Sequence, residues 1–496
     1  MHICAPGENS LTTEINDFLI EKPFGPVVKG GDSLWMIGRN GRGFEVTNVD
    51  YQSLSNDFVL HAVKKEKSRI FVRGEGSRLW DIEGQVYLDT MSGSAGPAMV
   101  GHAHPAVAEA VARQLAKLPS TNILHDSTPV IEFCSRLAAI TPPGLTKTFL
   151  CTGGGEAIEA AIKFAIRVTG RVEVLSLTGA YHGMSLATMG LTGMPALRKW
   201  LPGALRWPAF RQIPSADPYR PPLGEGPESW KAAARALEAD LDGGSSRQVA
   251  AFLMEIVQGP NGHTVFPAEY YRTIQEVCRK HGILLIVDEV QTGLARCGAT
   301  WACDLFDVHP DILVAGKAMG GGFPIGTFTT RKDLIPENLE FEPWHMLTFM
   351  NQPLAAAAGL AVLNIVEKEH LAERARVLGA MATEWFQGLA RRFEVIGDVR
   401  GPGLFIGVDF VEDRQTKAPA TEACRKAWEF ALDHGLITQF GGTASNVLKF
   451  KPPLTTPEAD FKRMLELAAD TAAFIQTEVD QQQKKPAPPE HAGVVR

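Results

Sequence analysis

The stretch Ile283-Leu284-Leu285-Ile286-Val287-Asp288-Glu289-Val290-Gln291-Thr292-Gly293 joins an apolar run to two acids. A second apolar run, Asp311-Ile312-Leu313-Val314-Ala315-Gly316, leads into Lys317 and the cluster Gly320-Gly321-Gly322. A continuous apolar run bounded by turn signals is typical of a strand buried on both faces of a parallel sheet. The sequence therefore places Asp288 and Lys317 at the carboxyl ends of parallel strands, where open α/β sheets bind their ligands.

An amine and a carboxylate at one such crevice suit a particular cofactor. Pyridoxal 5'-phosphate needs a lysine for its Schiff base and an acid opposite its pyridine nitrogen. Lys317 and Asp288 are the candidates for these two roles. A surface lysine would not need the apolar approach and the glycines that follow Lys317. An acid that ends a buried strand needs a cation nearby in any case, because an unpaired buried charge is costly.

Several further motifs occur in a fixed order and give the chain a family resemblance. Over roughly residues 70 to 475 the chain resembles the class III aminotransferases, which are fold type I pyridoxal-phosphate enzymes. The resemblance rests on Leu79-Trp80-Asp81-Ile82-Glu83-Gly84, Gly101-His102-Ala103-His104-Pro105, Gly154-Gly155-Glu156-Ala157, Tyr181-His182-Gly183, Asp288-Glu289-Val290-Gln291-Thr292-Gly293, Lys317 and Lys449-Phe450-Lys451-Pro452-Pro453-Leu454. The resemblance implies an α/β fold with a mostly parallel sheet flanked by helices and a smaller α+β domain.

The resemblance also implies roles for individual residues. Lys317 and Asp288 match the catalytic lysine and acid, and Gln291 matches a position that contacts the phenolic oxygen of the cofactor or groups beside it. Tyr181 matches an aromatic residue that stacks on the pyridine ring, whereas His182 is expected to support the site structurally. Thr348 matches a threonine that reaches the phosphate in the other subunit, so its role implies a homodimer with shared active sites.

The glycine-rich turn Thr152-Gly153-Gly154-Gly155-Glu156 lies between a predicted strand and a predicted helix. Free backbone N–H groups at a helix start bind phosphate, and glycine lets the backbone approach closely. Gly154 and Gly155 are therefore expected to bind the phosphate of the cofactor. The family commonly has Ser or Thr where Gly153 stands, so that hydroxyl contact is expected to be either absent or replaced by Thr152.

The substrate side departs from the family. Most members have Arg where this chain has Lys449, and that Arg grips the substrate carboxylate with two parallel hydrogen bonds. Lysine offers a point charge without the planar fork, so the exchange changes how an anion is held. Glu255 matches a family acid near the substrate, Ser94 is a further candidate for contact with the substrate, and Lys451 is the alternative cation for holding it.

Within the family the chain is most similar to the dialkylglycine decarboxylases, through Ile140-Thr141-Pro142-Pro143-Gly144-Leu145, Ile396-Gly397-Asp398-Val399-Arg400-Gly401 and Asp413-Arg414-Gln415-Thr416-Lys417. Those enzymes have Trp at the position of Tyr181 and Gln near Ser94, so their decarboxylation is not simply inherited. The expected function is an aminotransferase that moves an amino group between an amine or amino acid and a 2-oxo acid or aldehyde. The alternatives are a decarboxylating transaminase, a racemase, an amine lyase and, more distantly, a non-catalytic binding protein.

The chain of 496 residues is long enough for two or three domains. We expect an N-terminal arm and partial small-domain segment over residues 1–70, whose glycines interrupt any periodicity. A large cofactor domain is expected over 71–345, with a hairpin at its start. Residues 346–480 are expected to form a connecting helix and a small domain, and residues 481–496 a disordered tail. The stretch 205–248, rich in Pro, Gly and charge, is expected to be a surface excursion of the large domain.

Composition excludes several classes of protein. A net charge of -7 provides no basic surface for nucleic acid or an anionic membrane. No apolar stretch reaches the length of a membrane span, and the first residues show no targeting pattern, so a cytoplasmic protein is expected. The seven cysteines are scattered singly, which indicates neither a disulfide framework nor a zinc site.

Overall fold

The structure, a computed structural model, describes residues 26–29, 33–37, 43–47, 49–63, 67–199, 209–244, 248–339 and 343–484. The chain divides into two compact units, Met1–Val72 with Asp81–Gly84, and Arg73–Trp80 with Gln85–Arg496. In the first unit, strands β1 (Pro26–Lys29), β2 (Ser33–Ile37) and β3 (Gly43–Thr47) form an antiparallel sheet in that order. Helix α2 (Tyr51–Phe58) follows. The N-terminal segment is therefore more regular than its glycines predict.

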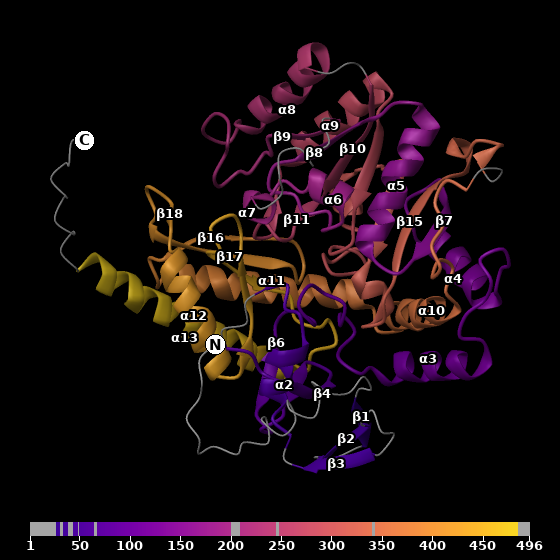
Figure 1. Cartoon of the computed structure of the whole chain (residues 1–496). Helices are drawn as coiled ribbons and strands as arrows, with labels where there is room; N and C mark the ends of the chain where they lie inside the picture. Colours follow the sequence, from indigo (N-terminus) through magenta and orange to yellow (C-terminus); the bar gives the residue numbers. More distant parts are fainter. Residues whose placement is uncertain are drawn as a thin grey trace, which may run out of the picture. The chain divides into compact units, whose positions relative to one another are not determined.

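A seven-stranded sheet forms the centre of the second unit (Figure 1). Its strands lie in the order β7 (Leu145–Cys151), β15 (Gly326–Arg331), β14 (Ile312–Gly316), β13 (Leu284–Asp288), β10 (Val249–Glu255), β8 (Glu173–Leu177) and β9 (Phe210–Ile213). All are parallel except β15, which pairs antiparallel with both of its neighbours. The α/β class with a mostly parallel sheet is confirmed.

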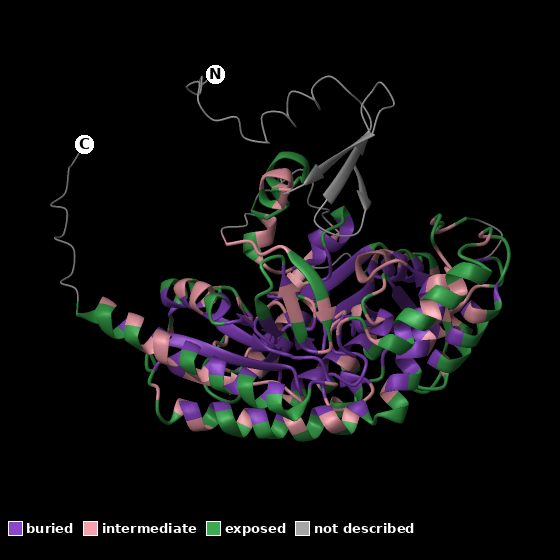
Figure 2. Ribbon diagram, turned by 90° about the horizontal axis from the view of Figure 1, so that it is seen from below, coloured by how far each residue is buried: buried purple, intermediate pink, exposed green. Residues whose placement is uncertain are grey.

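Helices cover both faces of this sheet. Alternate residues of β13 point to opposite faces, so Leu284 and Ile286 pack in one core with α5 (Gly154–Thr169), while Leu285 and Val287 pack in another with α9 (Ala268–His281). Both helices end at a glycine in the left-handed conformation, Gly170 and Gly282. In Figure 2 the buried colour is concentrated in the interior strands, and the exposed colour lies mostly on the outer helices. Burial on both faces explains why the strands read as continuous apolar runs.

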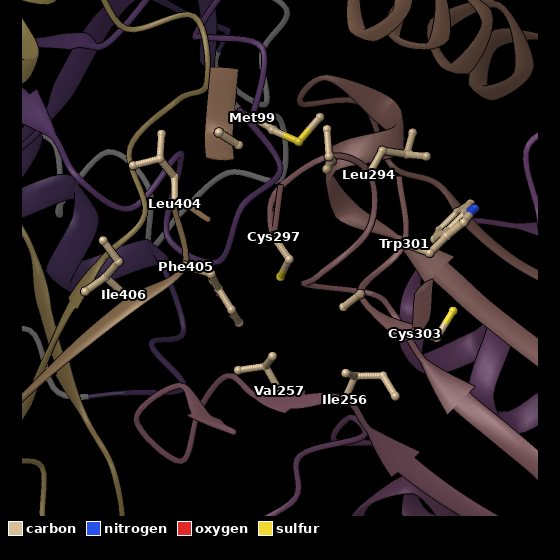
Figure 3. Packing of buried hydrophobic residues seen from close by; sticks show 14 of the residues in the cluster. Met99, Ile256, Val257, Leu294, Cys297, Trp301, Cys303, Leu404, Phe405 and Ile406 are labelled. Carbon is tan, nitrogen blue, oxygen red and sulfur yellow. The ribbon is translucent and has the colours of Figure 1, made fainter. Parts of the chain in front are cut away.

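A second, antiparallel sheet follows in the C-terminal part of the same unit. Its order is β16 (Ile396–Arg400), β17 (Ile406–Asp413), β21 (Val447–Phe450) and β20 (Gln439–Gly441). Helices α11 (Leu371–Ala390), α12 (Thr421–Asp433) and α13 (Glu458–Gln483) accompany it. Leu404 and Phe405 just before β17, and its first residue Ile406, share one apolar core with residues that follow β10 and β13 (Figure 3). This core holds the antiparallel sheet against the ends of the parallel strands.

The remaining elements include a further sheet and several helices. The hairpin predicted at residues 78–89 is present as β5 (Arg78–Asp81) and β6 (Val86–Asp89), in a sheet of order β19-β6-β5-β4. The other strands are β4 (Phe71–Glu75), β19 (Leu436–Ile437), β11 (Val257–Gln258), β12 (Thr264–Val265) and β18 (Ala418–Pro419). The other helices are α3 (Pro105–Lys117), α4 (Thr128–Ala138), α6 (Leu186–Leu191), α7 (Pro195–Arg198), α8 (Trp230–Ala239) and α10 (Pro353–Lys368).

Three differences from the sequence-based expectations stand out. The stretch 205–248 contributes β9 to the edge of the central sheet as well as α8. Strand β15 was not anticipated. Helix α13 extends to Gln483, so the first residues of the expected tail are helical, and residues 485–496 lie outside the described part. Among the described residues, no helix is both long and apolar enough to cross a membrane.

Candidate active site

A cavity of about 220 Å³ opens at the carboxyl ends of the parallel strands, where the sequence predicts the ligand site. Both predicted catalytic residues line it, Asp288 as the last residue of β13 and Lys317 as the first residue after β14. The complete lining is Gly154, Gly155, Tyr181, His182, Gly183, Met184, Glu255, Asp288, Val290, Gln291 and Lys317. Five separate segments of the chain thus meet around one small volume.

The backbone at Lys317 has an uncommon conformation. Its φ of 44° lies in the left-handed region that non-glycine residues rarely adopt, and a short 3-10 turn begins at this residue. Such strain persists where surrounding structure enforces it, which is frequent at functional sites. Burial lowers the pKa of the Lys317 amine, and the carboxylates of Asp288 and Glu255 act in the opposite direction. A lowered pKa favours the deprotonated, nucleophilic amine.

Asp288 is buried and held by two partners. Its Oδ1 accepts a hydrogen bond of 3.0 Å from the backbone N–H of Val290, and its Oδ2 lies 2.9 Å from His182 Nδ1. The side chain of His182 is fully buried, and its Nε2 has no hydrogen-bond partner among the described residues. His182 therefore orients the carboxylate, which agrees with the structural role expected for it.

Helix α5 begins at the cavity with Gly154 and Gly155. A Cβ on Gly154 would lie 2.7 Å from Val290 Cγ1, so only glycine fits there, whereas a Cβ on Gly155 would meet nothing within 4 Å. The expected replacement of a family hydroxyl by Thr152 is not supported, because Thr152 Oγ1 donates to Glu156 Oε2 at 2.5 Å. The first N–H groups of this 16-residue helix have no partner within the helix, a feature that suits such an end to an anion.

Glu255 ends β10 and lies directly beside Asp288 in the sheet register. Its two oxygens accept hydrogen bonds from the backbone N–H groups of Tyr181, at 2.8 Å, and Gly259, at 3.1 Å. Burial raises the pKa of Glu255 to about 7, with the nearby charge of Asp288 acting in the same direction. The contact with Tyr181 fixes the backbone of this aromatic residue at the mouth of the cavity.

The two lysines of the Lys449–Lys451 segment are both buried beside the site. Burial lowers the pKa of Lys449 to about 8, Glu255 opposes that change, and the charge of Lys317 adds to it. Both of these charges belong to residues that line the cavity, whereas Lys449 itself does not line it. Lys451 Nζ donates to Gln291 Oε1 at 3.0 Å, a contact that the sequence did not reveal. The signal that could have found it is a second cation in an otherwise apolar strand.

Other candidates lie outside the cavity lining. Ser94 and Thr348 are exposed, which leaves Thr348 accessible to a second subunit. Glu289 is turned into the core, where its carboxylate accepts hydrogen bonds from Thr292 Oγ1 and the backbone N–H of Cys303. His102 contacts Asp89 at 2.8 Å, and His104 caps α3, so both have the structural roles expected for them.

The side chains present fit pyridoxal phosphate. A buried amine, a buried carboxylate, a helix start with two glycines and an aromatic side chain all line one cavity. These are the groups required by its aldehyde, pyridine nitrogen, phosphate and ring, respectively. Within the described residues, no cluster of His, Cys, Asp and Glu could hold a metal ion.

Comparisons with known proteins agree with this fit. The family model for aminotransferase class-III matches residues 61–471. The 5-aminovalerate aminotransferase of Pseudomonas aeruginosa is 35% identical over 404 residues, which cover 80% of this chain and 92% of that protein. The leucine/methionine racemase of Thermococcus litoralis is 35% identical over 390 residues, covering 78% of this chain and 86% of that one.

Among solved structures, a thermostable (S)-enantioselective omega-transaminase from Thermomicrobium roseum superposes with a TM-score of 0.79 at 31% identity. The match covers 87% of this chain and all of that one. The sequence relatives, the shared fold and the groups around the cavity therefore point to the same chemistry. This chain belongs to the class III aminotransferases and is a pyridoxal-phosphate-dependent transaminase.

Proposed function

We propose that Lys317, Asp288 and the cavity around them form the centre at which an amino group passes from a donor to an oxo acceptor. The observation that carries this proposal is the convergence of Lys317 and Asp288 from neighbouring strands on one cavity. Pyridoxal phosphate, when bound, supplies an electron sink for the charge that develops at the substrate carbon. The side chains of this chain would bind, orient and move protons around it.

Five residues would hold the cofactor ring and its phosphate. Asp288, oriented by His182, would pair with the pyridine nitrogen and keep it protonated. Tyr181 would stack on the ring, and Gln291 would contact the phenolic oxygen. The N–H groups of Gly154 and Gly155 would bind the phosphate, because the start of α5 has unpaired donors and the positive end of the helix dipole.

Lys317 would serve twice. Its amine would hold the cofactor before substrate arrives, and once released it would carry a proton between the substrate carbon and the cofactor. An amine with a lowered pKa suits this work, because a general base functions best when its pKa lies near the operating pH. Burial of the site also limits exchange of that proton with water.

The substrate would be an amine or amino acid, paired with a 2-oxo acid or aldehyde. Lys449 would attract a substrate anion as a point charge, and Glu255 would balance that charge when the anion is absent. Ser94 is a further candidate for contact with the substrate. The 35% identity to a 5-aminovalerate aminotransferase supports testing donors that carry an amine remote from their carboxylate.

Racemisation is the second candidate function. A racemase and a transaminase share the removal of a proton from the substrate carbon and differ in where a proton returns. The relative named as a leucine/methionine racemase, at 35% identity, favours including this reaction in any assay. Decarboxylation, the reaction of the dialkylglycine decarboxylases that the sequence resembles, is a further outcome to monitor.

A stepwise assay separates these reactions. Purified protein with pyridoxal phosphate is given amino donors one at a time, without an acceptor, while the visible band is recorded. A transaminase loses the band and releases one oxo product per site, and a 2-oxo acid then restores the band. Inversion of donor chirality with the band retained would indicate a racemase, and release of carbon dioxide would indicate a decarboxylase. Absence of a visible band would contradict the cofactor site itself.

We further propose a cytoplasmic homodimer in which Thr348 completes the phosphate site of the partner. The domains would be a cofactor domain over residues 71–345 and a small domain over 346–480. Mixing Lys317→Ala and Thr348→Ala subunits tests the shared site. If Thr348 acts across the dimer, each mixed dimer contains one intact site, and activity exceeds that of either parent. Activity no higher than that of Thr348→Ala alone would indicate that Thr348 serves its own subunit.

A further inference from the structure

Lys451 is one of the largest fully buried side chains in the described chain, with 2% of its surface exposed. Its backbone is fixed on both sides, because its N–H donates to Thr90 O at 2.9 Å and its carbonyl accepts from Ser92 Oγ at 2.7 Å. The side chain passes the Phe405 ring, with Nζ 5.6 Å from the ring centre. It ends at Gln291, where Nζ donates to Oε1 at 3.0 Å.

The amine of Lys451 has no carboxylate within ion-pair distance among the described residues. Burial lowers its pKa well below the usual value, and Lys449, Lys317 and Arg296 add to the effect while Asp89 opposes it. Burial lowers the pKa of His263, and the charge of Lys451 adds to that effect. A buried lysine without a counter-charge costs stability, so an apolar side chain of the same length would be the more stable choice for filling this space.

The hydrogen bond to Gln291 is therefore the interaction that could explain why a lysine occupies this buried position. Because Lys451 Nζ donates to Oε1, the carboxamide has its oxygen turned toward the lysine and its nitrogen turned away from it. Gly259 confines the same group from another side, since a Cβ there would lie 2.8 Å from Gln291 Nε2. Gln291 lines the cavity and Lys451 does not. With Oε1 engaged, the two N–H groups of the carboxamide are the ones available to a ligand.

We propose that Lys451 is a positioning residue that directs the N–H groups of Gln291 at the bound cofactor and so sets the pH at which the cofactor changes colour. This inference rests on the proposed binding of pyridoxal phosphate in the cavity. An N–H that donates to the phenolic oxygen draws electron density from it, which weakens the hold of the cofactor on its neighbouring proton. Loss of that donor therefore moves the colour change to higher pH.

The test is a pH titration of the visible absorption band in holoenzyme of wild type, Lys451→Met, Gln291→Leu and the double variant. Methionine keeps an unbranched stem of similar volume without the charge. Lys451→Met is expected to raise the midpoint by about one pH unit, the scale of one hydrogen bond to a charged group. Gln291→Leu is expected to do the same. The double variant should match Gln291→Leu alone, because Lys451 then has no amide to orient.

A Lys451→Arg variant retains N–H donors at this position and should keep the midpoint near that of wild type. It serves as the control that substitution of this buried residue does not by itself shift the midpoint. An unshifted midpoint in Lys451→Met would overturn the proposal. So would a Lys451→Met shift that persists in full beside Gln291→Leu, because the lysine would then act on the cofactor directly through its charge. A wild-type protein without a visible band would instead contradict the proposed cofactor site, whereas a visible band that does not titrate would overturn only the present proposal, which separates the two failures.

Discussion

His182 Nδ1 lies 2.9 Å from Asp288 Oδ2, and both side chains are buried at the end of β13. The contact joins the Tyr181-His182-Gly183 motif to the acid that faces the cavity. The other oxygen, Asp288 Oδ1, accepts a hydrogen bond from the N–H of Val290. Because both oxygens are held, the carboxylate cannot rotate freely. The orientation of Asp288, the proposed partner of the pyridine nitrogen, is thus fixed before any cofactor binds.

Asp288→Asn should slow turnover by roughly 10²-fold or more while the cofactor still binds. Asparagine keeps the size of the side chain but removes the negative charge that would hold the pyridine nitrogen protonated. Single-turnover loss of the visible band with a good amino donor measures this step apart from product release. Near-normal single-turnover rates would show that Asp288 does not serve the ring nitrogen.

Glu255 predicts a pH-dependent contribution to stability. Burial raises its pKa from an ordinary 4.5 to about 7, so between these values the folded state binds a proton that the unfolded state has released. Stability therefore falls as pH rises from about 4.5 to about 7 and levels off above that. Urea unfolding of wild type and Glu255→Gln, compared at several pH values, should show wild type losing stability relative to the variant across this window. A constant difference would contradict the raised pKa.

The two glycines at the start of α5 should respond differently to the same substitution. Gly154→Ala pushes a methyl group against Val290, whose branched side chain has little freedom, and should destabilise the fold by about 1 to 3 kcal/mol. Gly155→Ala meets open space at the cavity, so it should leave unfolding unchanged and weaken retention of the cofactor. Equal effects of both changes on cofactor retention, with no loss of stability in either, would contradict this separation.

Lys449 predicts how the substrate anion is held. Lys449→Ala should raise KM for carboxylate-bearing donors by about 10- to 100-fold and leave neutral amines little changed, because only the former use the charge. Lys449→Arg restores the fork of the relatives and is expected to improve binding of ordinary amino acids at the expense of the native substrate. KM values for charged and neutral donors that move together in both variants would place the anion contact on Lys451 or elsewhere.

The strands that carry the site could be predicted because their signal is local. β13 and β14 are apolar runs that end at Asp288 and Lys317, and parallel strands bring such ends together. Family motifs then identified Tyr181, His182 and the α5 glycines. The sequence thus predicted both the location of the cavity and most of its lining.

What it missed depends on contacts between distant segments. Strand β15 runs against its neighbours, and nothing in Gly326–Arg331 itself encodes that direction. β9 lies in a stretch whose composition resembles that of a loop, and it forms a strand because it pairs with β8. The contact of Lys451 with Gln291 joins residues 160 positions apart, so no local pattern could reveal it.

The assignment of Lys317 as the cofactor lysine can be tested by finding which lysine forms the imine with the cofactor. Holoenzyme is treated with borohydride, which fixes an imine irreversibly, and its peptides are mapped by mass spectrometry. We expect the cofactor mass on Lys317, with neither Lys449 nor Lys451 labelled, and we expect Lys317→Ala to retain cofactor only loosely and to lose turnover. Label on another lysine, or an active Lys317→Ala enzyme, would contradict this assignment.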